Sequence, residues 1–200
     1  LFLHNLEQRV TPWYHCGAES AGNGSLMRIA PLVLLHPEGN SAALWLDTAL
    51  ASIVTHRDAC SVASCVAFTD LLARLLRLPA PPTAAWITGT FLATLRQVCT
   101  DQPYRARGGQ FSAREGTFPD YLEHVLAEAA RHDWDTRTAC AAWQSGAYLL
   151  ETVPSVLWIL ARHAHDPEEA IVRAVNDTCD NDTVAAIVGA AVGALHGEGA

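Results

Sequence analysis

The residues with the most specific chemistry in this chain form one short acidic turn. Residues 176–183 read Asn-Asp-Thr-Cys-Asp-Asn-Asp-Thr, which places three carboxylates among amide and hydroxyl oxygens. Hard cations such as Mg²⁺ prefer this set of donors, with water completing the octahedron. Asp180 and Asp182 alternate along an extended turn and Thr183 begins a helix, so their oxygens can converge on one ion. Asp180, Asp182 and Thr183 are therefore candidate metal ligands.

Helix capping is the competing interpretation of this turn. Asp182 is well placed as an N-cap, and each acidic residue near a helix N-terminus stabilises the helix by about 0.3–1 kcal/mol. Capping accounts for one aspartate, whereas three neighbouring carboxylates repel one another unless a cation is present. On residue types alone the two interpretations are equally supported. An EF-hand is excluded because its glycine and bidentate glutamate are absent at the required offsets.

A glycine-rich turn is the second candidate. Residues 20–28 read Ser-Ala-Gly-Asn-Gly-Ser-Leu-Met-Arg. Gly22 and Gly24 permit close approach of the backbone, and successive N–H groups can cradle a phosphate where a helix begins, here at Ser25. The turn is not a P-loop, because GK[ST] and a preceding strand are missing. An ordinary turn remains the commoner interpretation, and Arg28 fits either a phosphate contact or an ion pair at a helix end.

Of the nine histidines, His56 lies in the most suggestive context. The tetrapeptide at 55–58 closes one helix and opens the next. On local grounds His56 is a helix-end histidine more often than a ligand contact.

Helices must position these residues. Apolar side chains recur every three or four positions along most of the chain, and alternation with a period of two is absent over any useful length. Pro119 suits a first helical turn, whereas Pro154 predicts a kink. We expect an all-α fold with a compact multi-helix bundle and one domain over residues 1–200. The expected helices span 42–54, 58–77, 84–98, 120–130, 147–162, 167–175 and 183–195.

Two segments call for separate expectations. The helix at 183–195 is almost entirely Ala, Val and Gly, so we expect it to be buried in the centre of the fold, as a rigid platform for the acidic turn. The polar segment at 100–117 is long for a connection within a bundle. It is equally well explained as a solvated linker or as a lid that faces a substrate.

Composition excludes several classes of protein. Half of the 200 residues are hydrophobic and 17% are charged, which argues against disorder. A net charge of −8 without a basic cluster argues against non-specific nucleic-acid binding. No apolar run is long enough for a membrane span, and no signal peptide is evident. Six scattered cysteines without a CxxC pair indicate free thiols in a reducing, cytoplasmic setting.

Four motifs, taken in their order along the chain, resemble the ADP-ribosylglycohydrolases, including the dinitrogenase-reductase-activating and ADP-ribosylarginine hydrolase types. These motifs are Gly-Asn-Gly-Ser-Leu-Met-Arg at 22–28, Thr-His-Arg-Asp at 55–58, Ser-Gly-Ala-Tyr-Leu-Leu-Glu-Thr at 145–152 and Asp-Asn-Asp-Thr at 180–183. The resemblance covers nearly the whole chain. It implies an all-α fold with a centre of two Mg²⁺ ions, for which Mn²⁺ is an alternative ion.

The resemblance also implies roles for individual residues. Asp180, Asp182 and Thr183 would supply metal ligands, and His56 would lie near the phosphates or the adenosine. The segment around Gly146 and Tyr148 would line the ligand cleft. The residues that would contact the pyrophosphate and ribose of ADP-ribose are Ser20, Ala21, Gly22, Asn23 and Gly24.

The chain departs from the family at one motif. The resemblance calls for an earlier Thr-Asp-Asp segment that supplies the other metal ligands and the acidic group of catalysis, and none occurs here. Thr69-Asp70 and Thr100-Asp101 lack the second carboxylate. Because the sequence also lacks an initiator Met, we expect it to be the C-terminal portion of a longer protein. The missing ligands would come from an N-terminal segment or from a second chain; otherwise catalysis has been lost.

The resemblance thus implies Mg²⁺-dependent hydrolysis of the glycosidic bond between ADP-ribose and an acceptor. The ligand would be ADP-ribose or an ADP-ribosylated substrate. The alternative is a catalytically inactive relative that binds ADP-ribose or serves a structural role. The acceptor has no signature in the sequence.

Overall fold

The chain folds as a helical bundle, which confirms the all-α prediction. The computed structural model describes residues 2–8, 11–38 and 41–197. Its α-helices are α1 (Phe2–Glu7), α2 (Ser41–Ile53), α3 (Ala59–Leu75), α4 (Ala84–Val98), α5 (Phe118–Arg131), α6 (Thr136–Ala142), α7 (Leu149–His163), α8 (Pro167–Asp177) and α9 (Asn181–His196). Short 3₁₀ helices span Trp13–His15 (η1), Leu26–Arg28 (η2) and Ala30–Leu35 (η3). Two strands, β1 (Pro103–Arg105) and β2 (Glu115–Thr117), form a small antiparallel sheet.

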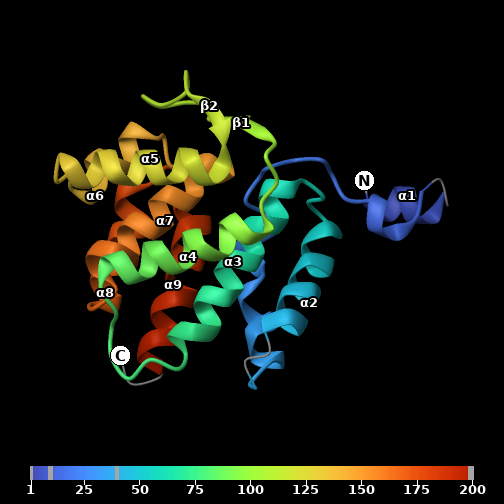
Figure 1. The fold of residues 1–200 in the computed structure, drawn as a ribbon, viewed down its shortest axis with the longest axis horizontal. Coiled ribbons are helices and arrows are strands. Elements are labelled where there is room, and N and C mark those ends of the chain that lie inside the picture. The colour runs from blue at the N-terminus through green and yellow to red at the C-terminus, as the bar shows by residue number, and fades with distance from the viewer. Residues whose placement is uncertain (1, 9–10, 39–40, 198–200) are drawn as a thin grey trace.

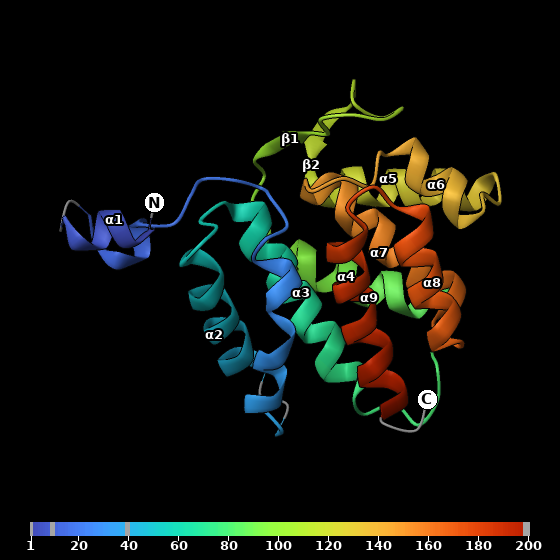
Figure 2. The same ribbon diagram turned by 180° about the vertical axis from the view of Figure 1, so that it is seen from behind.

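Two helices form the centre of the molecule. Every residue of α7 from Leu149 to Leu160 is buried, and α7 packs against α4, α5, α6, α8 and α9. Helix α3 is buried along most of its length and packs against α2, α4 and α9. Figures 1 and 2 show α1 apart from this bundle, beyond α2. The apolar stripes predicted from the sequence therefore meet around α3 and α7.

Side-chain caps define where several helices start. Asp58 accepts hydrogen bonds from the N–H groups of Cys60 and Ser61 at the start of α3. Thr117 caps α5, whose first turn holds Pro119 as predicted. Each cap satisfies N–H groups that have no partner within the helix. Pro154 lies inside α7 without ending it.

The acidic turn and the helix after it differ from expectation. Helix α9 begins at Asn181, two residues earlier than predicted. It is also not buried on all sides: Val184 and Ile187 are buried, whereas Ala186 and Gly193 are exposed. The expectation of a fully enclosed helix was wrong because small apolar residues permit burial without requiring it.

The segment at 100–117 contains structure that the sequence did not predict. Strands β1 and β2 pair there, with Pro103 opposite Thr117 and Arg105 opposite Glu115. Strands of three residues are too short to display alternation. The seven-residue helix α6 and the terminal α1 were missed for the same reason, since neither shows two full turns of periodicity.

Two expectations from composition can be compared with the structure. All six cysteines are free, as predicted. Among the described residues, no helix combines the length and the apolar character that crossing a membrane requires.

The Thr69-Asp70 pair is structural, and this yields a stability prediction. Asp70 is 4% exposed and accepts hydrogen bonds from Arg74 Nε (2.9 Å), Thr94 Oγ1 (2.9 Å) and Trp45 Nε1 (3.2 Å). Asp70→Ala leaves these donors without their acceptor, so we expect the free energy of unfolding to fall by about 3 kcal/mol. Urea denaturation measures this loss. Asp101→Ala, at an exposed position, is the control; equal effects of the two changes would contradict the assignment.

Candidate functional site

The glycine-rich turn is anchored along both of its edges. Just before the turn Ala18 forms a parallel bridge to His56, and within it Gly22 forms an antiparallel bridge to Tyr148. The second bridge includes a hydrogen bond from the N–H of Asn23 to the carbonyl of Ala147 (3.0 Å). These pairings bring three of the four sequence motifs together at one end of the bundle.

Asn23 connects these three motifs to the fourth, the acidic turn. Its Nδ2 donates to Asp180 Oδ2 at 2.5 Å and to Thr152 Oγ1 at 2.9 Å. Asn23 is 6% exposed, so both hydrogen bonds are made away from bulk water. Thr152 in turn donates to the carbonyl of Gly146 (2.7 Å). One buried amide therefore orients the carboxylate of Asp180 and connects it to α7.

A strained turn before α7 holds the backbone of the acidic turn. Gln144 and Ser145 have φ values of 73° and 44°, a left-handed conformation that is uncommon for residues other than glycine. In that conformation the carbonyl of Ser145 accepts the N–H of Asp180 (3.0 Å), and its Oγ accepts the N–H of Cys179 (3.0 Å). Strain of this kind persists where surrounding contacts enforce it, often at functional sites.

Capping does not account for the acidic turn. The N-cap residue of α9 is Asp180, not Asp182 as predicted, and its side chain makes no capping hydrogen bond. Asp182 is exposed and, among the residues that the structure describes, accepts a hydrogen bond only from the N–H of the adjacent Thr183 (2.8 Å). Thr183 is 7% exposed, with its hydroxyl 3.7 Å from Met27 Sδ. The two carboxylates are thus available for another role.

The donors of this turn fit one side of a Mg²⁺ site. Asp180, Asp182 and Thr183 supply hard oxygen ligands from one short segment. Within the described part of the chain, however, no group of three His, Cys, Asp or Glu side chains is arranged to hold a metal. The acidic turn by itself is therefore not a complete metal site.

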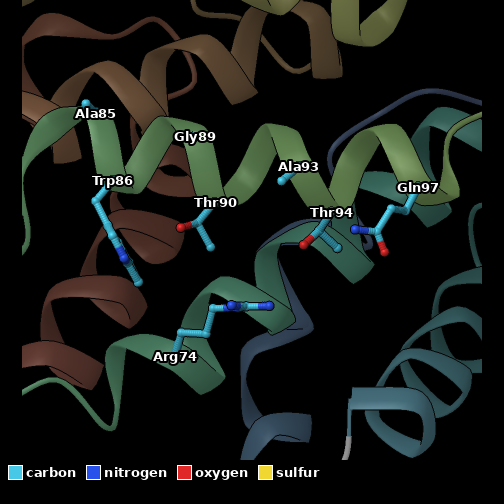
Figure 3. A pocket seen from close by; sticks show the side chains of 8 residues that line it. All are labelled: Arg74, Ala85, Trp86, Gly89, Thr90, Ala93, Thr94 and Gln97. Carbon is cyan, nitrogen blue, oxygen red and sulfur yellow. The ribbon is translucent and has the colours of Figure 1, made fainter.

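Asp70 cannot supply the missing ligand. Figure 3 shows a hollow of about 350 Å³ between α3 and α4, where Arg74 of α3 faces Thr94 of α4. Both side chains hold the carboxylate of Asp70. None of the predicted site residues lines this hollow. Asp70 is committed to joining α3 and α4.

The ring of His56 lies against the glycine turn. A Cβ on Gly24 would stand 2.8 Å from His56 Cε1, and one on Gly22 would stand 3.4 Å from Nε2. A side chain at Gly24 would require the ring to shift, whereas one at Gly22 would make an ordinary contact with it. His56 Nδ1 lies 3.1 Å from Thr55 Oγ1. Burial and the nearby charge of Arg28 lower the pKa of His56, which keeps the ring neutral at pH 7.

Among the described residues, Arg28 forms hydrogen bonds at the end of α2 rather than an ion pair with a carboxylate. Its Nη2 donates to the carbonyl of Ala51 (2.9 Å), in the last turn of α2, and to Thr55 Oγ1 (2.7 Å). A cation at a helix C-terminus is stabilised by the helix dipole. Arg28 thus fixes the segment that carries His56.

The remaining predicted residues also lie in this cluster. Ser20 Oγ accepts the N–H of Gly22 (3.3 Å), and Ala21 is 4% exposed, with its carbonyl bound to the N–H of Leu149. A Cβ on Gly146 would stand 2.6 Å from Glu151 Oε2. Tyr148, the residue before α7, pairs with Gly22. The structure therefore places all predicted site residues at one end of the bundle.

Sequence reasoning assigned no role to four further residues here. Tyr104 donates its hydroxyl to the carboxylate of Asp58 (3.1 Å), which ties β1 to the start of α3. Glu151 is buried and accepts the N–H of Arg107 (3.0 Å), and Arg107 stacks on Tyr148. Asp58 and Glu151 lie within motifs quoted above, whereas the signal at Arg107 was the Gly-Gly pair that directly follows it in a polar segment.

Comparisons with known proteins agree with this arrangement. A sequence model of the family described as ADP-ribosylglycohydrolase matches residues 1–200, so the chain belongs to this family. It is also similar to the uncharacterized protein YegU of Escherichia coli (strain K12), with 25% identity over 178 residues. The match covers 88% of this chain and 50% of YegU, so the chain spans about half the length of that relative.

The electrostatics of His56 can be tested directly. Arg28→Gln removes one of the two causes that lower the pKa of His56, so that pKa should rise towards its ordinary value while burial still holds it below. Arg28→Lys keeps the charge and should leave it low. A ¹H–¹⁵N NMR titration of the imidazole measures the shift. An unchanged pKa in Arg28→Gln would contradict the electrostatic link.

Proposed function

We propose that this member of the ADP-ribosylglycohydrolase family takes part in Mg²⁺-dependent hydrolysis of the glycosidic bond between ADP-ribose and an acceptor. The observation that carries the proposal is the contact of Asn23 with Asp180 at 2.5 Å. It joins a turn suited to phosphates to a turn suited to a metal ion. A nucleotide sugar has anionic phosphates next to a reactive ribose, so one molecule can span both turns.

In this proposal the glycine turn binds the diphosphate side of the substrate. The N–H groups of Ser20, Gly22 and Asn23 are bound within the protein, so those of Ala21 and Gly24 are the donors that this turn would offer to a phosphate. His56 supports that turn from behind, as a neutral ring. Tyr148 and Gly146 line the adjoining side. Anchoring the phosphates in this way positions the ribose without entering the chemical step.

Asp180, Asp182 and Thr183 would hold Mg²⁺, and two ions are expected in the complete site. When bound, the metal would orient the ribose hydroxyls and activate a water for attack on the anomeric carbon. Asn23 orients the carboxylate of Asp180 through the amide contact. Ser145 fixes the backbone of the turn. These contacts keep the ligands close to their bound positions, which reduces the cost of binding a metal.

The remaining ligands and the catalytic base would come from outside the described cluster. Mg²⁺ requires near-ideal octahedral geometry, which the acidic turn alone does not supply. We propose that an N-terminal segment or a second chain completes the site. Asp182 is exposed, so that side of the turn is open to such a segment.

Removal of one metal ligand tests the proposal. Asp182→Ala should abolish Mg²⁺-dependent release of ADP-ribose from ADP-ribosylated protein, as followed by chromatography. It should also abolish any gain in ADP-ribose affinity that Mg²⁺ produces in calorimetry. Glu168→Ala, an exposed carboxylate on α8, is the control. Unaltered turnover in Asp182→Ala would contradict the metal assignment. Binding of ADP-ribose without turnover, by the protein together with the segment or chain that completes its site, would instead favour an inactive ADP-ribose-binding relative.

A further inference from the structure

The segment between β1 and α5 carries an arginine with an unusual environment. The guanidinium of Arg107 lies 4.4 Å from the centre of the Tyr148 ring. Tyr148 pairs with Gly22, so Arg107 stands beside the glycine turn. Arg105, two residues earlier, forms an ion pair with Glu115 (3.0 Å). Among the residues that the structure describes, no carboxylate forms an ion pair with Arg107.

The backbone around Arg107 is fixed at several points. Tyr104 is bound to Asp58 on one side. On the other, the N–H of Gln110 donates to the carbonyl of Ala142 (2.6 Å). Between them, Glu151 accepts the N–H of Arg107 (3.0 Å). This part of the segment is therefore neither a free linker nor a loose lid.

Two glycines make this close packing feasible. A Cβ on Gly108 would overlap the side chain of Gln144, at 1.2 Å from its Oε1. Gly109 has a φ of +78°, and a Cβ there would stand 2.4 Å from the carbonyl of Ala142. Gly109 requires glycine, because its φ is positive and the clash is with backbone, whereas a side chain at Gly108 would require Gln144 to move. Glycine loses more conformational entropy on folding than other residues. Two glycines nevertheless directly follow Arg107, where the backbone is closely packed.

Glu151 is a buried carboxylate, and its hydrogen bonds also fix the backbone at Arg107. It is 2% exposed, and its burial raises its pKa, while the N–H groups of Arg107 and Gly108 oppose that rise. Burying a carboxylate is costly unless hydrogen bonds compensate it. The compensating donors here are the main-chain groups that set the position of Arg107.

An anionic ligand needs such a cation at this place. The chain has a net charge of −8, and Asp58, Asp180 and Asp182 lie in the same cluster of motifs. These carboxylates disfavour a phosphate nearby, unless a cation offsets them. An arginine stacked on an aromatic ring keeps its edge N–H donors free for a planar, two-pronged contact with phosphate oxygens. Arg28 already donates two hydrogen bonds through its Nη2, to the carbonyl of Ala51 and to Thr55 Oγ1.

We propose that Arg107 is a substrate-binding residue that contacts the diphosphate of the ADP-ribosyl group, and that Glu151 is the positioning residue that holds it on Tyr148. The proposal rests on the proposed function for the identity of the substrate. The binding of a diphosphate by the guanidinium of Arg107 can be tested separately with inorganic pyrophosphate.

The experiment compares two arginines of one hairpin by calorimetry. Arg107→Ala should weaken ADP-ribose and pyrophosphate binding about tenfold at low salt, the loss of one charge-assisted contact. The difference should shrink at high salt. Arg107→Lys keeps the charge without the stacking and should retain part of the affinity. Arg105→Ala removes the same charge from an ion pair outside the cluster and should leave the affinity unchanged. All three variants keep the backbone N–H bound by Glu151.

The outcomes separate this inference from the proposed function. If the unmodified protein binds ADP-ribose and Arg107→Ala matches Arg105→Ala, the inference is wrong and the proposed function stands. If it binds pyrophosphate through Arg107 but not ADP-ribose, the inference stands and the proposed substrate is wrong. Binding of neither probe overturns both.

A second variant tests the positioning role. Glu151→Gln retains the size of the side chain, but its amide presents one N–H₂ group where a carboxylate oxygen accepted. Hydrogen exchange at the amides of Arg107 and Gly108 should become faster, and ADP-ribose binding weaker. In the double variant with Arg107→Ala the two losses should not add, because both act through one guanidinium. Additive losses, or unchanged exchange, would show that Glu151 acts independently of Arg107.

Discussion

The arrangement of this site depends on one buried amide that must have partners for its hydrogen-bond donors. Asn23 is 6% exposed, and leaving its Nδ2 unsatisfied would cost about 1–3 kcal/mol. Thr152 and Asp180 satisfy it, one from α7 and one from the turn before α9. The same residue donates its backbone N–H to Ala147. Displacing the glycine turn would therefore break contacts to two helices at once, so the turn is rigid although it lacks regular structure.

Three helices begin beside this amide, and their N-termini shape its electrostatics. Asp58, Tyr148 and Asp180 are the N-cap residues of α3, α7 and α9. Helix N-termini carry partial positive charge and stabilise nearby anions. This explains how an acidic chain can gather several carboxylates at one place without a lysine or arginine paired to each. It also means that Arg28 and Arg107, the nearby cations, have distinct effects: one fixes the His56 segment, and the other faces outwards over Tyr148.

Periodicity in the sequence predicted the long helices well, because burial of one face repeats every turn. The prediction for 84–98 coincides with α4, and the predictions for α3, α5 and α8 differ from the structure only at their ends. Shorter elements were not predicted, because α6 and the β1–β2 pair contain too few residues to show a repeating apolar pattern. The sequence identified the motif residues but did not predict which of them contact one another. The contact between Asn23 and Asp180 joins residues 157 positions apart, and that between Arg107 and Glu151 joins residues 44 apart. Local patterns carry no information about such pairings.

The acidic turn has a closed side and an open side, and this limits how the proposed metal site could be completed. Asn23 and Ser145 bind the turn from within the bundle, and Met27 covers the hydroxyl of Thr183. Asp182 remains exposed. Asp70, the nearest counterpart of the absent motif in sequence, joins α3 to α4 and cannot turn towards the site without stranding three donors. Further protein ligands would therefore have to approach from the open side. An approaching carboxylate would meet Asp180 and Asp182 at close range, a repulsion that a divalent cation removes. Under the proposed function, metal binding and docking of a completing segment should thus be coupled, each strengthening the other.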